Sequence, residues 1–204
     1  MIRVLVVGLV LLVAVMFLLP RPGVRAPTEL SATQLDQPRE LPAVPLIDQD
    51  GEPFEISTLA GRPAFVFFGF TNCPDICPLT LAVLADALER LREQAPGLAP
   101  AVLFISVDPG RDSPERIRTY VNAFDPAFIG ATADEATLAP LLATLGVTVH
   151  KEQHGDETYN VVHNGTVYVL DSAARWTAIF GGSSHRAETL VADTLAMRAR
   201  LAAE

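Results

Sequence analysis

The run AFVFFGF, residues 64–70, most constrains how this chain can fold. Seven consecutive apolar or glycine residues are typical of a strand that is buried on both faces, in a sheet covered by helices. After Pro78 the apolar residues follow the spacing of a helix with one buried face, at Leu81, Leu84, Leu88 and Leu91. A buried strand followed closely by such a helix indicates the α/β class.

The same alternation continues to the end of the chain. A hairpin around Asp50-Gly51 precedes the first buried strand, and AVLFISVD predicts a second strand at 101–108. A helix follows, with Ser113 as N-cap and Pro114 at its first position. Further on we expect a short strand, a helix ended by Gly146, a closing pair of strands and an amphipathic helix, at 127–132, 134–146, 162–181 and 186–202. The pattern predicts a mixed central sheet flanked by helices.

The N-terminus carries a long apolar segment. Residues 1–20 contain one charge, Arg3, and an unbroken apolar run from Val4 to Leu19, which we interpret as an uncleaved membrane anchor; the alternative is a cleaved signal peptide. Four prolines in residues 21–42 indicate an extended tether, so the folded domain is expected at 43–204. Either interpretation places the domain outside the cytoplasm, on the periplasmic face of a bacterial inner membrane, where disulfides persist.

The charge of the chain excludes one class of partner. Its formal net charge is -9, and Lys151 is its single lysine. Nucleic acid needs clustered basic residues, so we expect no binding to it. No nucleotide-binding loop and no Ser-His-Asp set is present in the sequence.

Both cysteines lie in TNCPDICP, directly after the first buried strand. Prolines follow Cys73 and Cys77 and disfavour helical backbone at both, so we expect the helix to begin at Pro78 with the loop folded back over its N-terminus. A helix N-terminus favours the thiolate, which attacks disulfides and binds metals. A purely structural disulfide closing so short a loop would add little stability. The residues alone leave a redox pair and a metal site open.

Three blocks together resemble the Sco/SenC family of thioredoxin-like copper proteins that assist assembly of cytochrome c oxidase. These blocks are FVFFGFTNCPDICPLTLAVLADAL, LFISVDPGRDSPERIRTYVNAF and YNVVHNGTVYVLD, and the resemblance covers roughly residues 43–200. It implies a thioredoxin-like fold and a copper site, Cu(I) or Cu(II), formed by Cys73, Cys77 and His163. The same two cysteines would form a redox disulfide.

The resemblance implies a copper chaperone that supplies the CuA centre of cytochrome c oxidase subunit II. A copper donor and a dithiol reductant are then further partners, because the cysteines bind copper only when reduced. The alternative is an enzyme, a thiol:disulfide oxidoreductase that reduces the acceptor's cysteines with the same pair. Its weakness is that disulfide exchange has no need of a distant histidine.

The remaining polar candidates have weaker support. Asp108 ends a strand next to the one that leads to Cys73, and it is either a turn residue or a residue that supports the metal ligands. We expect His150 and His154 in a solvated, irregular hairpin rather than in a second metal site. His185 is expected near the start of the last helix and receives no role.

Overall fold

The computed structural model describes residues 30–97, 99–154, 158–163, 165–182 and 185–201. The predicted anchor, residues 1–20, and the first part of the predicted tether lie outside the described residues. In the part of the chain that is described, no helix is both long enough and apolar enough to span a membrane.

An eight-stranded mixed sheet forms the centre of the described structure, as predicted. The order of its strands is β1-β10-β9-β4-β5-β6-β2-β3. The neighbouring pairs β4–β5 and β5–β6 are parallel, and all the others are antiparallel. The strands are β1 (Thr33–Arg39), β2 (Leu46–Asp48), β3 (Pro53–Phe54), β4 (Ala64–Gly69), β5 (Ala101–Ser106), β6 (Ile129–Thr132), β9 (Val167–Leu170) and β10 (Trp176–Phe180).

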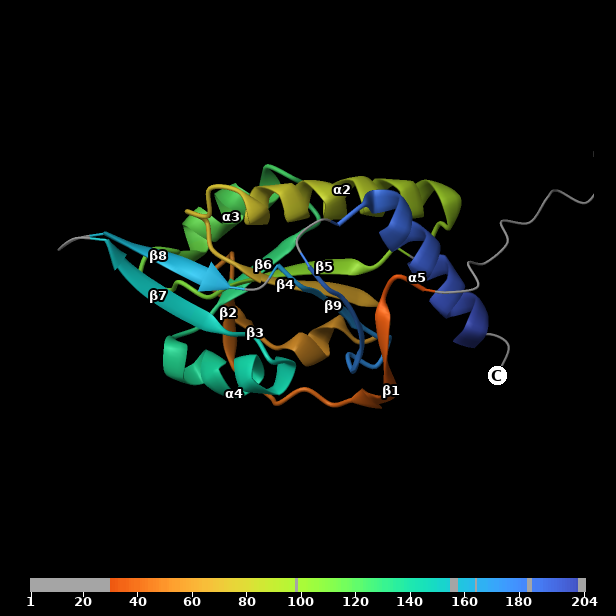
Figure 1. The fold of residues 1–204 in the computed structure, drawn as a ribbon, viewed down its shortest axis with the longest axis horizontal. Helices are drawn as coiled ribbons and strands as arrows, with labels where there is room; N and C mark the ends of the chain where they lie inside the picture. Colours follow the sequence, from red (N-terminus) through yellow and green to blue (C-terminus); the bar gives the residue numbers. More distant parts are fainter. Residues whose placement is uncertain (1–29, 98, 155–157, 164, 183–184, 202–204) are drawn as a thin grey trace, which may run out of the picture.

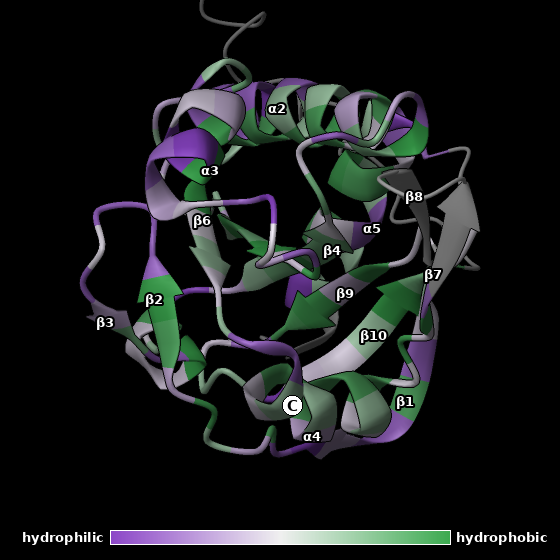
Figure 2. Cartoon of the chain, turned by 90° about the vertical axis from the view of Figure 1, so that its left-hand side faces the viewer, coloured by the Kyte–Doolittle hydropathy of each residue, from purple (hydrophilic) through white to green (hydrophobic). Residues whose placement is uncertain are grey.

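Helices cover both faces of this sheet, which explains why its central strands have no polar side. In Figure 1, α2 and α3 lie on one side of the sheet and α4 lies on the other, while α5 packs against α2. The helices are η1 (Ile56–Leu59), α2 (Ile76–Gln94), α3 (Pro114–Asn122), α4 (Glu135–Leu145) and α5 (Ala187–Leu201). Figure 2 shows the hydrophobic residues of β4 and β9 inside and hydrophilic residues on α3.

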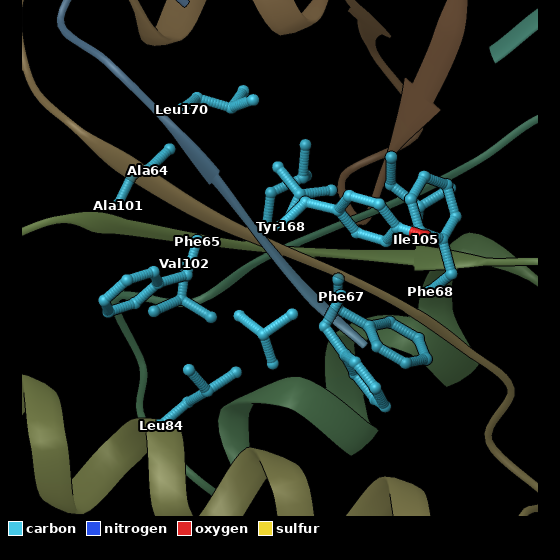
Figure 3. Close-up of a cluster of buried hydrophobic side chains, with 14 of the residues drawn as sticks. Ala64, Phe65, Phe67, Phe68, Leu84, Ala101, Val102, Ile105, Tyr168 and Leu170 are labelled. Atoms are coloured by element: carbon cyan, nitrogen blue, oxygen red, sulfur yellow. The ribbon is translucent and has the colours of Figure 1, made fainter. Parts of the chain in front are cut away.

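The core is built around β4 and β5. All six residues of each strand are buried, which confirms the prediction made from their apolar runs. Figure 3 shows Phe65, Phe67 and Phe68 of β4 packed with residues of β5 and β9. The ring of Phe68 meets that of Tyr168 edge to face, with centroids 5.7 Å apart, a favoured aromatic geometry. This packing makes β4 a rigid support for the loop that follows it.

The helix ends follow the expected signals. The Ser113 hydroxyl accepts a hydrogen bond from the backbone N–H of Arg116, and Pro114 begins α3. Helix α4 ends at Gly146, which has a φ of 67°, a left-handed conformation that glycine adopts without steric cost.

Part of the predicted tether is a strand of the sheet. Residues Thr33–Arg39, TQLDQPR, form β1 and pair with β10. All but one of these residues are exposed, because β1 is an edge strand held by backbone hydrogen bonds. Such a strand carries no hydrophobic alternation, so the sequence pattern gave no sign of it.

A separate hairpin lies outside the main sheet. Strands β7 (Val149–His154) and β8 (Thr158–His163) pair with each other in a regular antiparallel register, and the hairpin extends away from the body in Figure 1. We expected an irregular hairpin here, whereas the described residues form six consecutive pairs. The hairpin leaves the body after α4 and returns to it just before β9.

Candidate functional site

The two cysteines lie at the start of α2, immediately beyond β4. They form no disulfide, and both are buried, with 9% of Cys73 and 0% of Cys77 exposed. Helix α2 begins at Ile76, with Asp75 at the N-cap position, so the expected start at Pro78 is wrong by two residues. Pro78 is tolerated in the first turn because the N–H groups there have no partner within the helix.

The loop folds back over the helix N-terminus, as predicted. The backbone N–H of Cys77 donates to the Sγ atom of Cys73 across 3.4 Å, and the N–H of Cys73 donates to the carbonyl oxygen of Phe70 across 3.2 Å. These two bonds bring the Cys73 sulfur next to the first turn of α2. The Cys77 thiol also has a side-chain hydrogen bond with Cys73, so the two thiols are within reach of a shared metal.

The environment of Cys77 favours its neutral form. The hydrogen bond with Cys73 raises the pKa of the Cys77 thiol most, and burial raises it further. The charge of Asp112 acts in the same direction, whereas a hydrogen bond with the Phe70 backbone lowers the pKa. The net shift is strongly upward, so the expected stabilisation of a thiolate by the helix N-terminus is outweighed at this residue. A metal that binds here must displace the proton.

Gly69 makes room for the Cys77 sulfur. A Cβ atom at this position would lie 3.0 Å from Cys77 Sγ and 2.7 Å from Cε2 of Phe104. Both separations are shorter than ordinary van der Waals contacts. The missing side chain lets α2 approach the end of β4, so it sets the depth at which Cys77 is buried.

Asp112 holds the loop that leads to Cys73. It is 1% exposed, and its carboxylate accepts hydrogen bonds from the Thr71 backbone N–H (2.8 Å), the Thr71 hydroxyl (2.6 Å) and the Ser106 hydroxyl (2.6 Å). A buried carboxylate with several donors is strongly constrained in position. The sequence pattern alone did not indicate a role for this residue. Asp112 belongs to VDPGRDSPE, part of the second block that resembles the Sco/SenC family, and this resemblance is the feature of the sequence that could have pointed to it.

Arg116 of α3 secures the same loop from the outside. Its Nε atom donates to the Thr71 hydroxyl at 2.7 Å, and its Nη2 atom donates to the Asn72 side-chain oxygen at 2.6 Å. Thr71 is thus bonded to both the buried carboxylate and the guanidinium, and Asn72 is bonded to the guanidinium. This arrangement holds the cysteine loop in one conformation.

Asp108 lies two residues beyond the end of β5, the strand next to β4, and not at the last position of the strand as predicted. It is fully buried, and its carboxylate accepts a hydrogen bond from Nε of Arg111 at 2.5 Å. The Arg111 guanidinium lies over the ring of Phe70, 5.9 Å from its centroid. Asp108 therefore reaches the cysteine loop through Arg111. Its support of a bound metal remains a prediction.

His163 is the last residue of β8 and pairs in register with Val149. Four residues later, Val167 of β9 pairs with Phe67 near the carboxyl end of β4. The topology thus brings the segment after His163 to the sheet end that carries the cysteine loop. The predicted position of the His163 side chain lies outside what the structure describes. Among the side chains that it does describe, no three His, Cys, Asp or Glu residues form a metal-binding group.

The other histidines occupy different positions. His150 is an exposed residue of β7, so it is on a strand rather than in an irregular loop. His154 ends the same strand. His185 lies two residues before α5, as expected, and its ring nitrogen Nε2 lies 2.6 Å from the carbonyl oxygen of Gly165.

Comparison with known proteins agrees with this architecture. The SCO1/SenC family model matches residues 33–198, a span that includes β1. The SCO2-like protein of Rickettsia prowazekii is 34% identical over 137 residues, which is 66% of this chain and 66% of the relative. The human protein SCO2 homolog, mitochondrial, is 34% identical over 140 residues, which is 68% of this chain but 52% of the human protein.

A solved structure shows the same fold. The structure of Arabidopsis thaliana ScoI with copper bound has a TM-score of 0.72 and 30% sequence identity, and it covers 79% of this chain and 98% of the plant one. The thioredoxin-like fold is thereby confirmed, and copper is bound by a homologous Sco protein. A family match over most of the chain, together with a paired-cysteine loop at the end of β4, leads to one conclusion: the chain is a member of the Sco/SenC family.

Proposed function

We propose that this protein is a membrane-tethered copper chaperone that delivers copper to the CuA centre of cytochrome c oxidase subunit II. One observation carries the proposal: two buried, reduced thiols lie together in a loop fixed by Asp112 and Arg116. A site that receives and releases a metal benefits from ligands that are already in position. The copper-bound Arabidopsis relative supports copper as the cargo.

The donor set suits copper. Thiolates are soft ligands that favour Cu(I), and an imidazole also accommodates Cu(II), so Cys73, Cys77 and His163 together can hold either oxidation state. Three protein ligands leave a position through which a ligand of the acceptor can enter. In this proposal the copper donor loads the site, a dithiol reductant keeps the cysteines reduced, and the N-terminal segment holds the domain at the outer face of the membrane.

Metal analysis of the full-length chain in detergent tests the cysteine ligands. The reduced protein is expected to bind one copper per chain, and the protein with a Cys73–Cys77 disulfide is expected to bind none tightly, because a disulfide offers no thiolate. Equal copper binding by both forms would overturn the cysteine-ligand proposal.

The variant His163→Ala separates delivery from thiol reduction. It is expected to fold, to form the Cys73–Cys77 disulfide normally, and to lose the Cu(II)–thiolate charge-transfer band and support of oxidase assembly. Disulfide exchange depends on the access and ionisation of the thiols, not on an imidazole of β8. His150→Ala in β7 is the matched control and is expected to behave as wild type. Normal oxidase assembly with His163→Ala, but not with Cys73→Ser, would favour a thiol:disulfide oxidoreductase instead.

A further inference from the structure

The hairpin that carries His163 needs support from the body. Strands β7 and β8 pair with each other and with no other described strand, and an isolated two-stranded hairpin is marginally stable in water. Its orientation therefore depends on the two points where it joins the domain. At the first, the N–H of Val147 donates to the carbonyl oxygen of Leu142 at 2.8 Å, and Val149 packs against the core.

The second joining point lies between β8 and β9, two residues after His163. Here the carbonyl oxygen of Gly165 is 2.6 Å from Nε2 of His185. A carbonyl oxygen only accepts hydrogen bonds, so Nε2 must carry the hydrogen and donate it. The two residues are 20 positions apart in the sequence. The contact therefore joins the end of the hairpin to the segment that leads into α5.

We infer that His185 is a positioning residue for the metal site: by bonding Gly165 it fixes the segment that carries His163 relative to the cysteine loop. The inference rests on the proposed ligand role of His163. The anchor therefore requires a hydrogen on Nε2, which the Nδ1–H tautomer lacks. Outer contacts that orient a ligand typically change metal affinity by about 10- to 100-fold when they are removed.

A matched pair of variants isolates the donor. His185→Gln keeps an N–H donor at a similar reach. In His185→Glu the glutamate has nearly the same shape as that glutamine, but when ionised it has no donor. Thr189→Glu adds the same negative charge to the pocket that His185 lines, and it serves as the charge control because Gly165 is not among the residues that line this pocket. All are made in the full-length chain in detergent and compared for Cu(II) affinity, Cu(I) affinity, the Cu(II)–thiolate band and thermal unfolding.

With His185→Glu we expect Cu(II) affinity to fall at least about 10-fold and the thiolate band to shift, because the imidazole matters most for Cu(II). Cu(I) affinity should fall less, since two thiolates alone can hold Cu(I). His185→Gln and Thr189→Glu should bind as wild type. A general loss of stability would instead lower both affinities together with the unfolding temperature, and that pattern would overturn the inference.

A second readout needs no copper. Nitrogen-15 NMR of the reduced, metal-free protein should show His185 as the Nε2–H tautomer when it is neutral; an Nδ1–H tautomer would overturn the anchor. If His163→Ala leaves Cu(II) binding intact, the proposed ligand set fails, and this inference fails with it. If His163→Ala abolishes Cu(II) binding while His185→Glu matches wild type in affinity and spectrum, the inference about His185 alone is overturned.

Discussion

The backbone N–H of Cys77 points at the sulfur of Cys73 across 3.4 Å. The N–H belongs to the first turn of α2, where backbone donors have no partner within the helix. Cys73 therefore supplies what a capping side chain usually supplies, and Asp75 at the N-cap position makes no such side-chain bond. This contact ends the cysteine loop and holds the Cys73 sulfur against the first turn of α2, where Cys77 lies.

This contact predicts unequal reactivity of the two thiols. Cys77 is fully buried and its pKa is raised, whereas 9% of Cys73 is exposed. In the reduced, metal-free protein, iodoacetamide at about pH 8, near the ordinary pKa of a thiol, should therefore modify Cys73 first. Peptide mass spectrometry of partially alkylated protein measures the order. Preferential modification of Cys77 would contradict it.

Asp112 is expected to be the most sensitive polar position near the site. In Asp112→Ala, the Thr71 N–H and the hydroxyls of Thr71 and Ser106 lose their acceptor. Bonds to a charged group contribute about 1.5–3 kcal/mol each, so the free energy of unfolding should fall by about 3 kcal/mol or more. Urea unfolding of residues 30–204 measures this value. Asp50→Ala, which breaks an exposed ion pair with Arg118, is the control and should change little. Equal effects of the two variants would argue against the anchoring role.

The sequence predicted the elements with a strong hydrophobic pattern and failed where stability has another source. The apolar runs of β4 and β5 lead directly to two central strands because burial on both faces selects such residues. β1 was missed because an edge strand can be polar on nearly every residue. Edge pairing is decided by the partner strand, which lies at the far end of the chain.

The site was predicted in the same uneven way. The cysteine pair is visible in the sequence because both thiols and their prolines are adjacent. Asp112 was not, because an aspartate before a helix N-cap is usually a solvated turn residue, and only the fold shows three donors around it. The contact between His185 and Gly165 joins two loops that no local pattern relates.

Gly69 gives a steric prediction. In Gly69→Ala the new Cβ would lie 2.7 Å from Phe104 Cε2 and 3.0 Å from Cys77 Sγ, so the start of α2 must move. Overpacking of this kind destabilises a fold by about 1–3 kcal/mol, and we expect weaker copper binding as well, because Cys77 is displaced. Gly181→Ala is the matched control, since a Cβ there meets no atom within 4 Å. Wild-type unfolding and copper affinity in Gly69→Ala would show that the site tolerates the shift.

The raised pKa of Cys77 predicts how stability depends on pH. A thiol with a higher pKa in the folded than in the unfolded chain keeps its proton in the fold after the unfolded chain has lost it. The stabilisation that the protonated Cys77 thiol contributes to the fold is therefore complete below the unfolded pKa of about 8.5. It declines as the pH rises above that value. For the reduced, metal-free protein, the free energy of unfolding should fall by up to about 1.4 kcal/mol per pH unit in that range. Urea unfolding at a series of pH values measures the slope, and Cys77→Ser should remove most of it. If Cys77→Ser shows the same slope as wild type, the pH dependence comes from other groups and the prediction for Cys77 is wrong.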